Sequence, residues 1–201
     1  MGIFNFIKNL FSKGQTIADI PMDIQTILQY KFPNGKYSCG GENYDSLIWH
    51  ADNPVSKPSE QELYDMWADV LLIIAKNEVI EQIRAKRDLA LSKDVLGMAE
   101  GKQYYFQRRL YAEIAWLNNL MLDAILKGET IISDSDIFIK NWITSTNEIV
   151  SLTKSELINI CSHLRDRDDL LVIQARKHKD RVLALTTLEE VSSYDINEAI
   201  V

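Results

Sequence analysis

The histidines and cysteines are the side chains of this sequence best suited to nucleophilic or metal chemistry. The three histidines are His50, His163 and His178, and none lies in an HExxH motif or has a partner at metal-ligand spacing. Cys161 lies two residues before His163, but on a helix such residues point in different directions. The sequence therefore predicts no catalytic residue, no metal site and no cofactor.

Carboxylate pairs and a glycine pair complete the groups that could do chemistry. Glu60 with Glu62 and Glu189 with Glu190 fall on expected helices, where acidic residues usually belong to the solvated surface. Gly40-Gly41 lacks the spacing of a phosphate-binding loop. These patterns indicate a protein that is not an enzyme.

The charge of the chain restricts its partners. It has 201 residues with 22 basic and 29 acidic side chains, for a net charge of -7. Because phosphate contacts dominate nucleic-acid affinity, we expect no nucleic-acid partner. Two distant cysteines favour a reducing compartment, and no apolar run is long enough to span a membrane. We therefore expect no membrane partner.

The segment 1–58 is predicted to form an N-terminal region with helices and a β-hairpin. Apolar spacing indicates a short helix over 2–13, and a second helix is expected from Pro21 to Phe32. Short strands over 37–41 and 44–49 are expected to pair as a hairpin.

The segment 59–201 is predicted to form a helical domain with an inserted hairpin. Ser59 and Glu62 form a capping box that opens a long helix to about Leu96, and a second long helix is expected from near Lys102 to Gly128. These two helices would form an antiparallel helical hairpin. The remaining expected elements are strands over 137–143 and 148–152, a long helix opened by Thr153, and a short helix capped by Thr187. The predicted fold is mainly α, with long helices in a bundle-like arrangement and two small β-hairpins.

Two sets of residues are candidates for partner binding. The first is the apolar face of the N-terminal helix, which packs either on its own domain or on a partner. Its members are Ile3, Phe6, Ile7, Leu10 and Phe11.

The second set follows a four-three spacing along the last long helix, which predicts packing against another helix. Leu164 and Leu171 are apolar members of this spacing, and His178 is a polar one. Polar positions such as His178 either pair locally or fix the register and the choice of partner.

The C-terminal third resembles a known family. Trp142-Ile-Thr-Ser-Thr-Asn-Glu-Ile-Val-Ser-Leu-Thr153 is followed by Leu157, His163, a charged helix and Leu185-Thr-Thr-Leu-Glu-Glu-Val-Ser-Ser-Tyr-Asp-Ile196. This order, over about residues 105–196, resembles a domain of unknown function at the C-terminal end of phage tail and tail-fibre-associated proteins. The run from Arg165 to Asp169 departs from the more apolar central helix of those families.

The N-terminal part is similar to small tail proteins of phages and defective prophages. The residues that carry this similarity are Tyr30-Lys-Phe-Pro-Asn34, Tyr44-Asp-Ser-Leu-Ile-Trp49 and Lys57-Pro-Ser-Glu-Gln-Glu-Leu63.

The resemblance implies a non-enzymatic tail accessory protein, either a structural component of the virion tail or a tail-fibre attachment or assembly factor. Its implied partners are other phage tail or tail-fibre proteins, with a homo-oligomer as a further possibility. It would be located in the virion tail, or in the host cytoplasm during assembly. The alternative is a phage or prophage protein that binds and inhibits a host factor.

Overall fold

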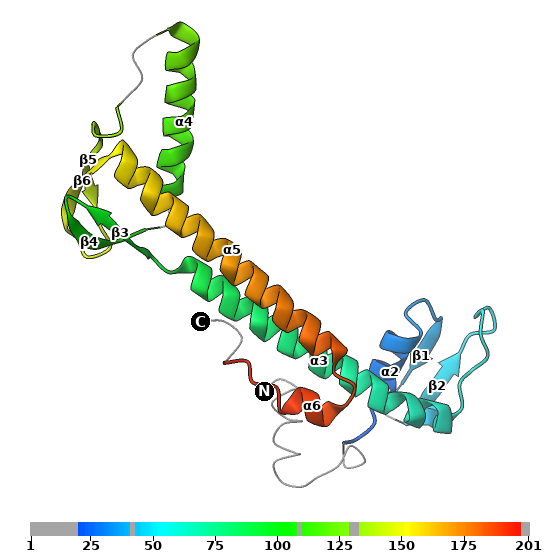
Figure 1. Ribbon diagram of the computed structural model, residues 1–201. Helices are drawn as coiled ribbons and strands as arrows, with labels where there is room; N and C mark the ends of the chain where they lie inside the picture. Colours follow the sequence, from blue (N-terminus) through cyan, green and yellow to red (C-terminus); the bar gives the residue numbers. More distant parts are fainter. Residues whose placement is uncertain (1–19, 41–42, 108–109, 129–132, 198–201) are drawn as a thin grey trace. The chain divides into compact units, whose positions relative to one another are not determined.

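The computed structural model describes residues 20–40, 43–107, 110–128 and 133–197 (Figure 1). The predicted helix over 2–13 lies outside the described residues. The chain is mainly helical with small antiparallel sheets, as predicted. Its elements in chain order are α2 (Ile24–Lys31), β1 (Tyr37–Cys39), the short 3-10 helix η2 (Tyr44–Ser46), β2 (Leu47–Trp49), α3 (Glu60–Ser92), β3 (Val95–Ala99), β4 (Lys102–Phe106), α4 (Leu110–Lys127), β5 (Ile137–Ile143), β6 (Ile149–Thr153), α5 (Lys154–Ala184) and α6 (Leu188–Ser192).

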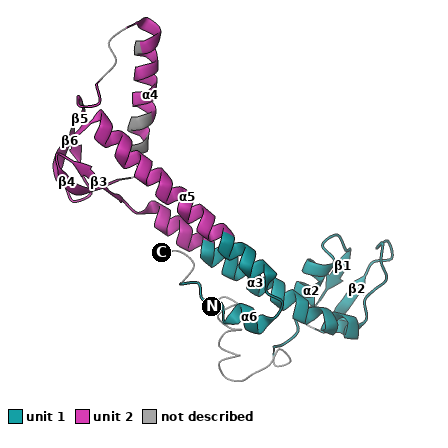
Figure 2. Cartoon of the chain, in the orientation of Figure 1, with its two compact units in different colours: residues 1–83, 177–199 teal, residues 84–176, 200–201 magenta. Residues whose placement is uncertain are grey.

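The chain divides into two compact units (Figure 2). Unit 1 comprises residues 1–83 and 177–199, and unit 2 comprises residues 84–176 and 200–201. Both α3 and α5 contribute residues to both units, so the compact units and the predicted segments 1–58 and 59–201 are different divisions of the chain.

Unit 1 begins with α2 and the β1–β2 hairpin. Asp23 caps α2 by accepting a hydrogen bond from the Thr26 amide, because the first amides of a helix have no partner within it. Three apolar side chains of α2 are buried, and β1 pairs with β2 in the antiparallel register Tyr37 to Trp49. The predicted helix and the predicted hairpin of this region are confirmed, but the second strand begins at Leu47, because Tyr44–Ser46 form the 3-10 helix η2.

A capping box opens α3, as predicted. The Ser59 hydroxyl accepts a hydrogen bond from the Glu62 amide at 3.2 Å, and the Glu62 carboxylate accepts one from the Ser59 amide at 2.7 Å. Behind this cap, the Trp67 ring nitrogen donates to the Ile20 carbonyl. The start of α3 is thereby fixed by local hydrogen bonds and by the core of unit 1.

The end of α5 lies against α3 within unit 1. The Lys76 ammonium group donates to the Leu183 carbonyl at 2.9 Å, in the last turn of α5. A cation at this place stabilises the carbonyls that have no partner within the helix. The short helix α6 follows, with Thr187 and Glu190 forming the predicted capping box.

Unit 2 contains a β-hairpin in addition to the two predicted from the sequence. β3 and β4 pair from Val95 with Phe106 to Ala99 with Lys102. The two turn residues, Glu100 and Gly101, have φ of 51° and 75°, the backbone of a tight turn that suits strand twist. The helix predicted from near Lys102 is therefore wrong at its start, since α4 begins at Leu110, and α3 ends at Ser92 instead of near Leu96.

This correction also removes the predicted helical hairpin. A β-hairpin lies between α3 and α4 in the chain, so these two helices are not joined by a short turn. The long helix beside α3 is α5 (Figure 1). The Arg167 guanidinium of α5 donates to the carbonyls of Lys93 and Asp94 at 2.8 and 3.2 Å, just past the end of α3. A further bond reaches the Leu91 carbonyl inside the last turn at 3.4 Å.

The core of unit 2 lies between its two hairpins and the first half of α5. β5 and β6 pair antiparallel with irregular register around Ile139, and Trp142 of β5 is 8% exposed, so it is a core residue. β3 approaches α5 closely at Gly97. The buried residues of this core are Val95, Ala99, Phe106, Leu117, Trp142, Val150, Leu152, Leu157, Ile160, Cys161 and Leu164.

Candidate partner-binding surfaces

The predicted seam residues Leu164 and Leu171 are inside the protein. Leu164 is 1% exposed and belongs to the core of unit 2, and Leu171 is 4% exposed. The side of the helix on which they lie is covered by the chain's own residues. Little of their side-chain surface is left for a second protein. We therefore do not include Leu164 and Leu171 in the candidate surface.

His178 pairs locally within unit 1. Its Nδ1 lies 2.6 Å from the Tyr194 hydroxyl, and the two rings meet edge to face. Together they border a pocket of about 360 Å³ near the end of α5. The local pairing that the sequence left open is the arrangement found, and it connects α5 to the segment after α6.

The other predicted partner-binding set, Ile3, Phe6, Ile7, Leu10 and Phe11, lies outside the described residues. The structure therefore says nothing about its surroundings.

Several large apolar side chains of α4 are exposed. Leu117 is buried at 1% exposed and anchors the helix in the core of unit 2, with Met121 packed against that core. Beyond this contact, α4 presents apolar side chains to solvent. They are Trp116, Leu120, Leu122, Ile125 and Leu126, with exposed fractions of 53%, 37%, 56%, 56% and 77%.

Helical spacing divides these side chains between two sides of α4. Leu122 is followed by Ile125 and Leu126 at three and four residues, so these three share one side. Trp116 and Leu120 are four residues apart and share another, where the Trp116 ring lies 5.2 Å from the Phe138 ring of β5. A helix that is apolar on most of its circumference is normally buried, so this exposure identifies a candidate docking surface.

The predicted helical hairpin would have covered one side of α4, so the sequence did not indicate its exposed sides. The signal available was the apolar run Leu120-Met-Leu-Asp-Ala-Ile-Leu126, which is denser than one packed face requires.

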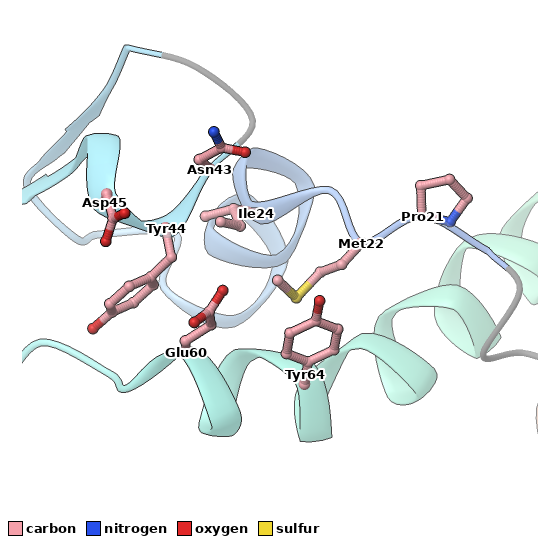
Figure 3. A pocket seen from close by; sticks show the side chains of 8 residues that line it. All are labelled: Pro21, Met22, Ile24, Asn43, Tyr44, Asp45, Glu60 and Tyr64. Atoms are coloured by element: carbon pink, nitrogen blue, oxygen red, sulfur yellow. The ribbon is translucent and has the colours of Figure 1, made fainter.

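A second concave surface lies in unit 1, where η2 and the start of α3 meet the segment leading into α2 (Figure 3). The pocket has a volume of about 440 Å³. Its lining residues are Pro21, Met22, Ile24, Asn43, Tyr44, Asp45, Glu60 and Tyr64. The sequence placed these residues in three separate elements and did not indicate that they meet.

Titration of the cap carboxylates and of one thiol is altered by the fold. Hydrogen bonds from Ser59 lower the pKa of Glu62, and those from the Thr186 and Thr187 amides lower the pKa of Glu190. Burial raises the pKa of the Cys161 thiol to about 11, which leaves little thiolate near neutral pH. Cys161 is therefore a core residue, in agreement with its 3% exposure.

Among residues 20–40, 43–107, 110–128 and 133–197, no group of three His, Cys, Asp or Glu side chains is arranged to hold a metal ion. Over the same residues, no helix combines the length and hydropathy of a membrane span.

Comparison with known proteins gives one family match. The chain matches no curated protein and no solved structure. Residues 74–198, which include most of α3 and everything from β3 to α6, match the model of a domain of unknown function, DUF4376. Because this match covers more than half of the 201 residues, the chain belongs to the DUF4376 family.

Proposed function

We propose that the chain is a non-enzymatic accessory protein of a bacteriophage tail that acts by binding other proteins. It would be either a structural component of the virion tail or a factor that attaches or assembles the tail fibre. The observation that carries the binding role is the exposed apolar surface of α4, defined by Trp116, Leu120, Leu122, Ile125 and Leu126.

The energetics of this surface favour a protein partner. Covering a half-exposed leucine or isoleucine removes apolar area from water, at about 25 cal/mol for each Å². Tryptophan is enriched among the residues that dominate interface energies, and Trp116 is 53% exposed beside Phe138. In Figure 2 the last turns of α4 extend away from the hairpins of its unit.

The tail context rests on sequence. The segment from Trp142 to Ile196 resembles the C-terminal domain of phage tail and tail-fibre-associated proteins. That segment lies entirely inside the family match at residues 74–198. The resemblance suggests a role in the phage tail, and the exposed surface of α4 is where the protein would bind its tail partners.

The proposal is tested in the phage that encodes the chain. The gene is deleted and complemented with either the wild type or the triple variant Leu122→Gln/Ile125→Gln/Leu126→Gln. Because these side chains are more than half exposed, the variant should fold with an unchanged melting temperature. We expect deletion and triple variant alike to yield particles with reduced tail-fibre content and adsorption, measured by quantitative mass spectrometry and plating.

The matched control is Leu89→Gln, which replaces an equally exposed leucine of unit 2 that lies on α3. It should restore particles as the wild type does. Presence of the chain in purified particles would identify a structural component, and its absence there an assembly factor. Particles of normal fibre content and adsorption after deletion would refute the proposal and favour the host-factor alternative.

A further inference from the structure

The pocket in unit 1 is negatively charged. Asp45 and Glu60 are its charged lining residues, and neither carboxylate has a hydrogen bond or ion pair with any residue that the structure describes. Other acidic side chains of this unit are paired, Asp52 with Lys36 and Asp69 with Lys31. The pocket therefore holds two carboxylates whose counter-charge the described part of the chain does not supply.

The position of Glu60 keeps its carboxylate available. Glu60 is the first residue of α3, where the helix dipole favours a negative charge. The neighbouring Glu62 performs the capping with Ser59, so Glu60 is not needed for that role. Figure 3 shows the Glu60 carboxyl group and the Tyr64 ring pointing from α3 toward Met22 and Ile24.

Aromatic and apolar groups form the rest of the wall. Tyr64 is 54% exposed and lines the pocket, while Ile24 is 1% exposed and closes the floor. The second tyrosine already attracts a cation, since the Lys57 ammonium lies 4.5 Å from the centroid of the Tyr44 ring. That ammonium donates to the Leu47 carbonyl and is not part of the lining, and the local charge remains negative when it is counted.

This combination suits an organic cation better than a metal ion. Two carboxylates are too few for the six to eight oxygen ligands of calcium. Tyrosine faces and apolar walls instead accommodate the methylene stem of a long side chain, while carboxylates bind its charged end.

We propose that this pocket binds the basic side chain, arginine or lysine, of a partner protein. Glu60 and Asp45 would receive the positive charge, the Tyr64 ring would contact it, and Met22 would contact the stem. The inference rests on the proposed function in one respect, namely that the basic side chain belongs to a protein partner. The surface of α4 belongs to the other unit, so the two sites can be tested separately.

The test uses the full-length protein and small probes. N-acetyl-arginine amide and N-acetyl-lysine amide are titrated against isotope-labelled protein by NMR, with N-acetyl-citrulline amide as the neutral isostere. We expect saturable shifts at the lining residues with an affinity on the order of millimolar for a basic probe. The neutral isostere should produce none, and added salt should weaken binding.

Variants locate the site. Glu60→Gln and Tyr64→Leu should each weaken binding of the basic probes about fivefold. The control Asp65→Asn removes the same charge from the same stretch of α3 at a residue that does not line the pocket, and it should bind as the wild type does.

Three results would overturn the inference. They are equal binding of the citrulline probe, no saturable shift with either basic probe, or an equal loss of affinity in Asp65→Asn and Glu60→Gln. The α4 triple variant should bind the probes normally. Failure of the phage complementation therefore leaves this result unaffected, and the reverse also holds.

Discussion

Gly97 is the residue at which the packing of unit 2 is most sensitive to a single methyl group. A Cβ atom at this position would lie 2.5 Å from Cγ1 of Ile160 and 3.1 Å from the Phe106 ring. Both neighbours are buried, at 1% and 0% exposed, so neither can move easily. The strand β3 thus lies on α5 at a distance that only glycine permits.

We expect Gly97→Ala to lower the free energy of unfolding by about 1–3 kcal/mol, because an added methyl group in a close-packed core forces its neighbours to shift. Urea denaturation followed by circular dichroism measures the change. The matched control is Gly40→Ala, where the added Cβ would meet no atom within 4 Å, and it should be nearly neutral. Equal stability of both variants would contradict the close approach of β3 to α5.

At the scale of elements, helix ends are stabilised by side chains of neighbouring helices. Arg167 of α5 donates to three carbonyls at and just past the end of α3, and Asp168 contacts its guanidinium at 3.1 Å. Both residues belong to the charge-rich run from Arg165 to Asp169. In the structure it is the place where α5 supports the end of α3.

Replacing Arg167 with Met should lower the free energy of unfolding by about 1–2 kcal/mol, since hydrogen bonds from a charged donor to these carbonyls are lost. The side chain is partly exposed, and water then satisfies some of the carbonyls. Chemical denaturation of the purified variant measures this change. Arg165→Met, which removes an exposed arginine from the same helix, is the control. A loss in the control as large as in Arg167→Met would assign the effect to net charge.

At the scale of the whole molecule, α3 and α5 each run without a break through both compact units. Leu71 of α3 is fully buried in unit 1, and Leu164 of α5 is 1% exposed in unit 2. If one unit unfolds, the part of each helix that belongs to that unit loses its packing. The rest of the same helix, in the other unit, then has a new unpaired end. Helix formation is cooperative along the chain, so the two units should share one transition.

Leu71→Ala and Leu164→Ala should therefore each lower the melting temperature of a single transition, with a loss of about 2–5 kcal/mol in each case. Differential scanning calorimetry measures the number of transitions and their midpoints. Two separate transitions, each shifted only by the substitution in its own unit, would show that the units unfold independently.

The starts of most helices follow from the sequence alone. Ser59, Thr153 and Thr187 each have a glutamate three residues later, and each pair forms a capping box. Such a box involves only neighbours in the chain, so its spacing is enough to predict it. The hairpins around residues 37–49 and 137–153 and the apolar side of α5 were predictable for the same kind of reason, from alternation and four-three spacing. The spacing did not show that Leu164 and Leu171 are buried within the chain itself.

The remaining features depend on contacts between distant segments. Residues from Phe106 to Met121 fit a helical spacing, yet Phe106 lies in β4 because the β3–β4 hairpin packs on α5 through Gly97. The spacing of the α5 seam predicted packing against another helix, but its first half packs in the core formed with the hairpins of unit 2. Hydrogen bonds from Arg167 and Lys76 show in addition that α3 of the same chain lies beside α5. The exposure of α4 and the meeting of Asp45, Glu60 and Tyr64 were likewise decided there. Local spacing fixes which side of a helix is apolar, whereas the folded chain determines what covers that side.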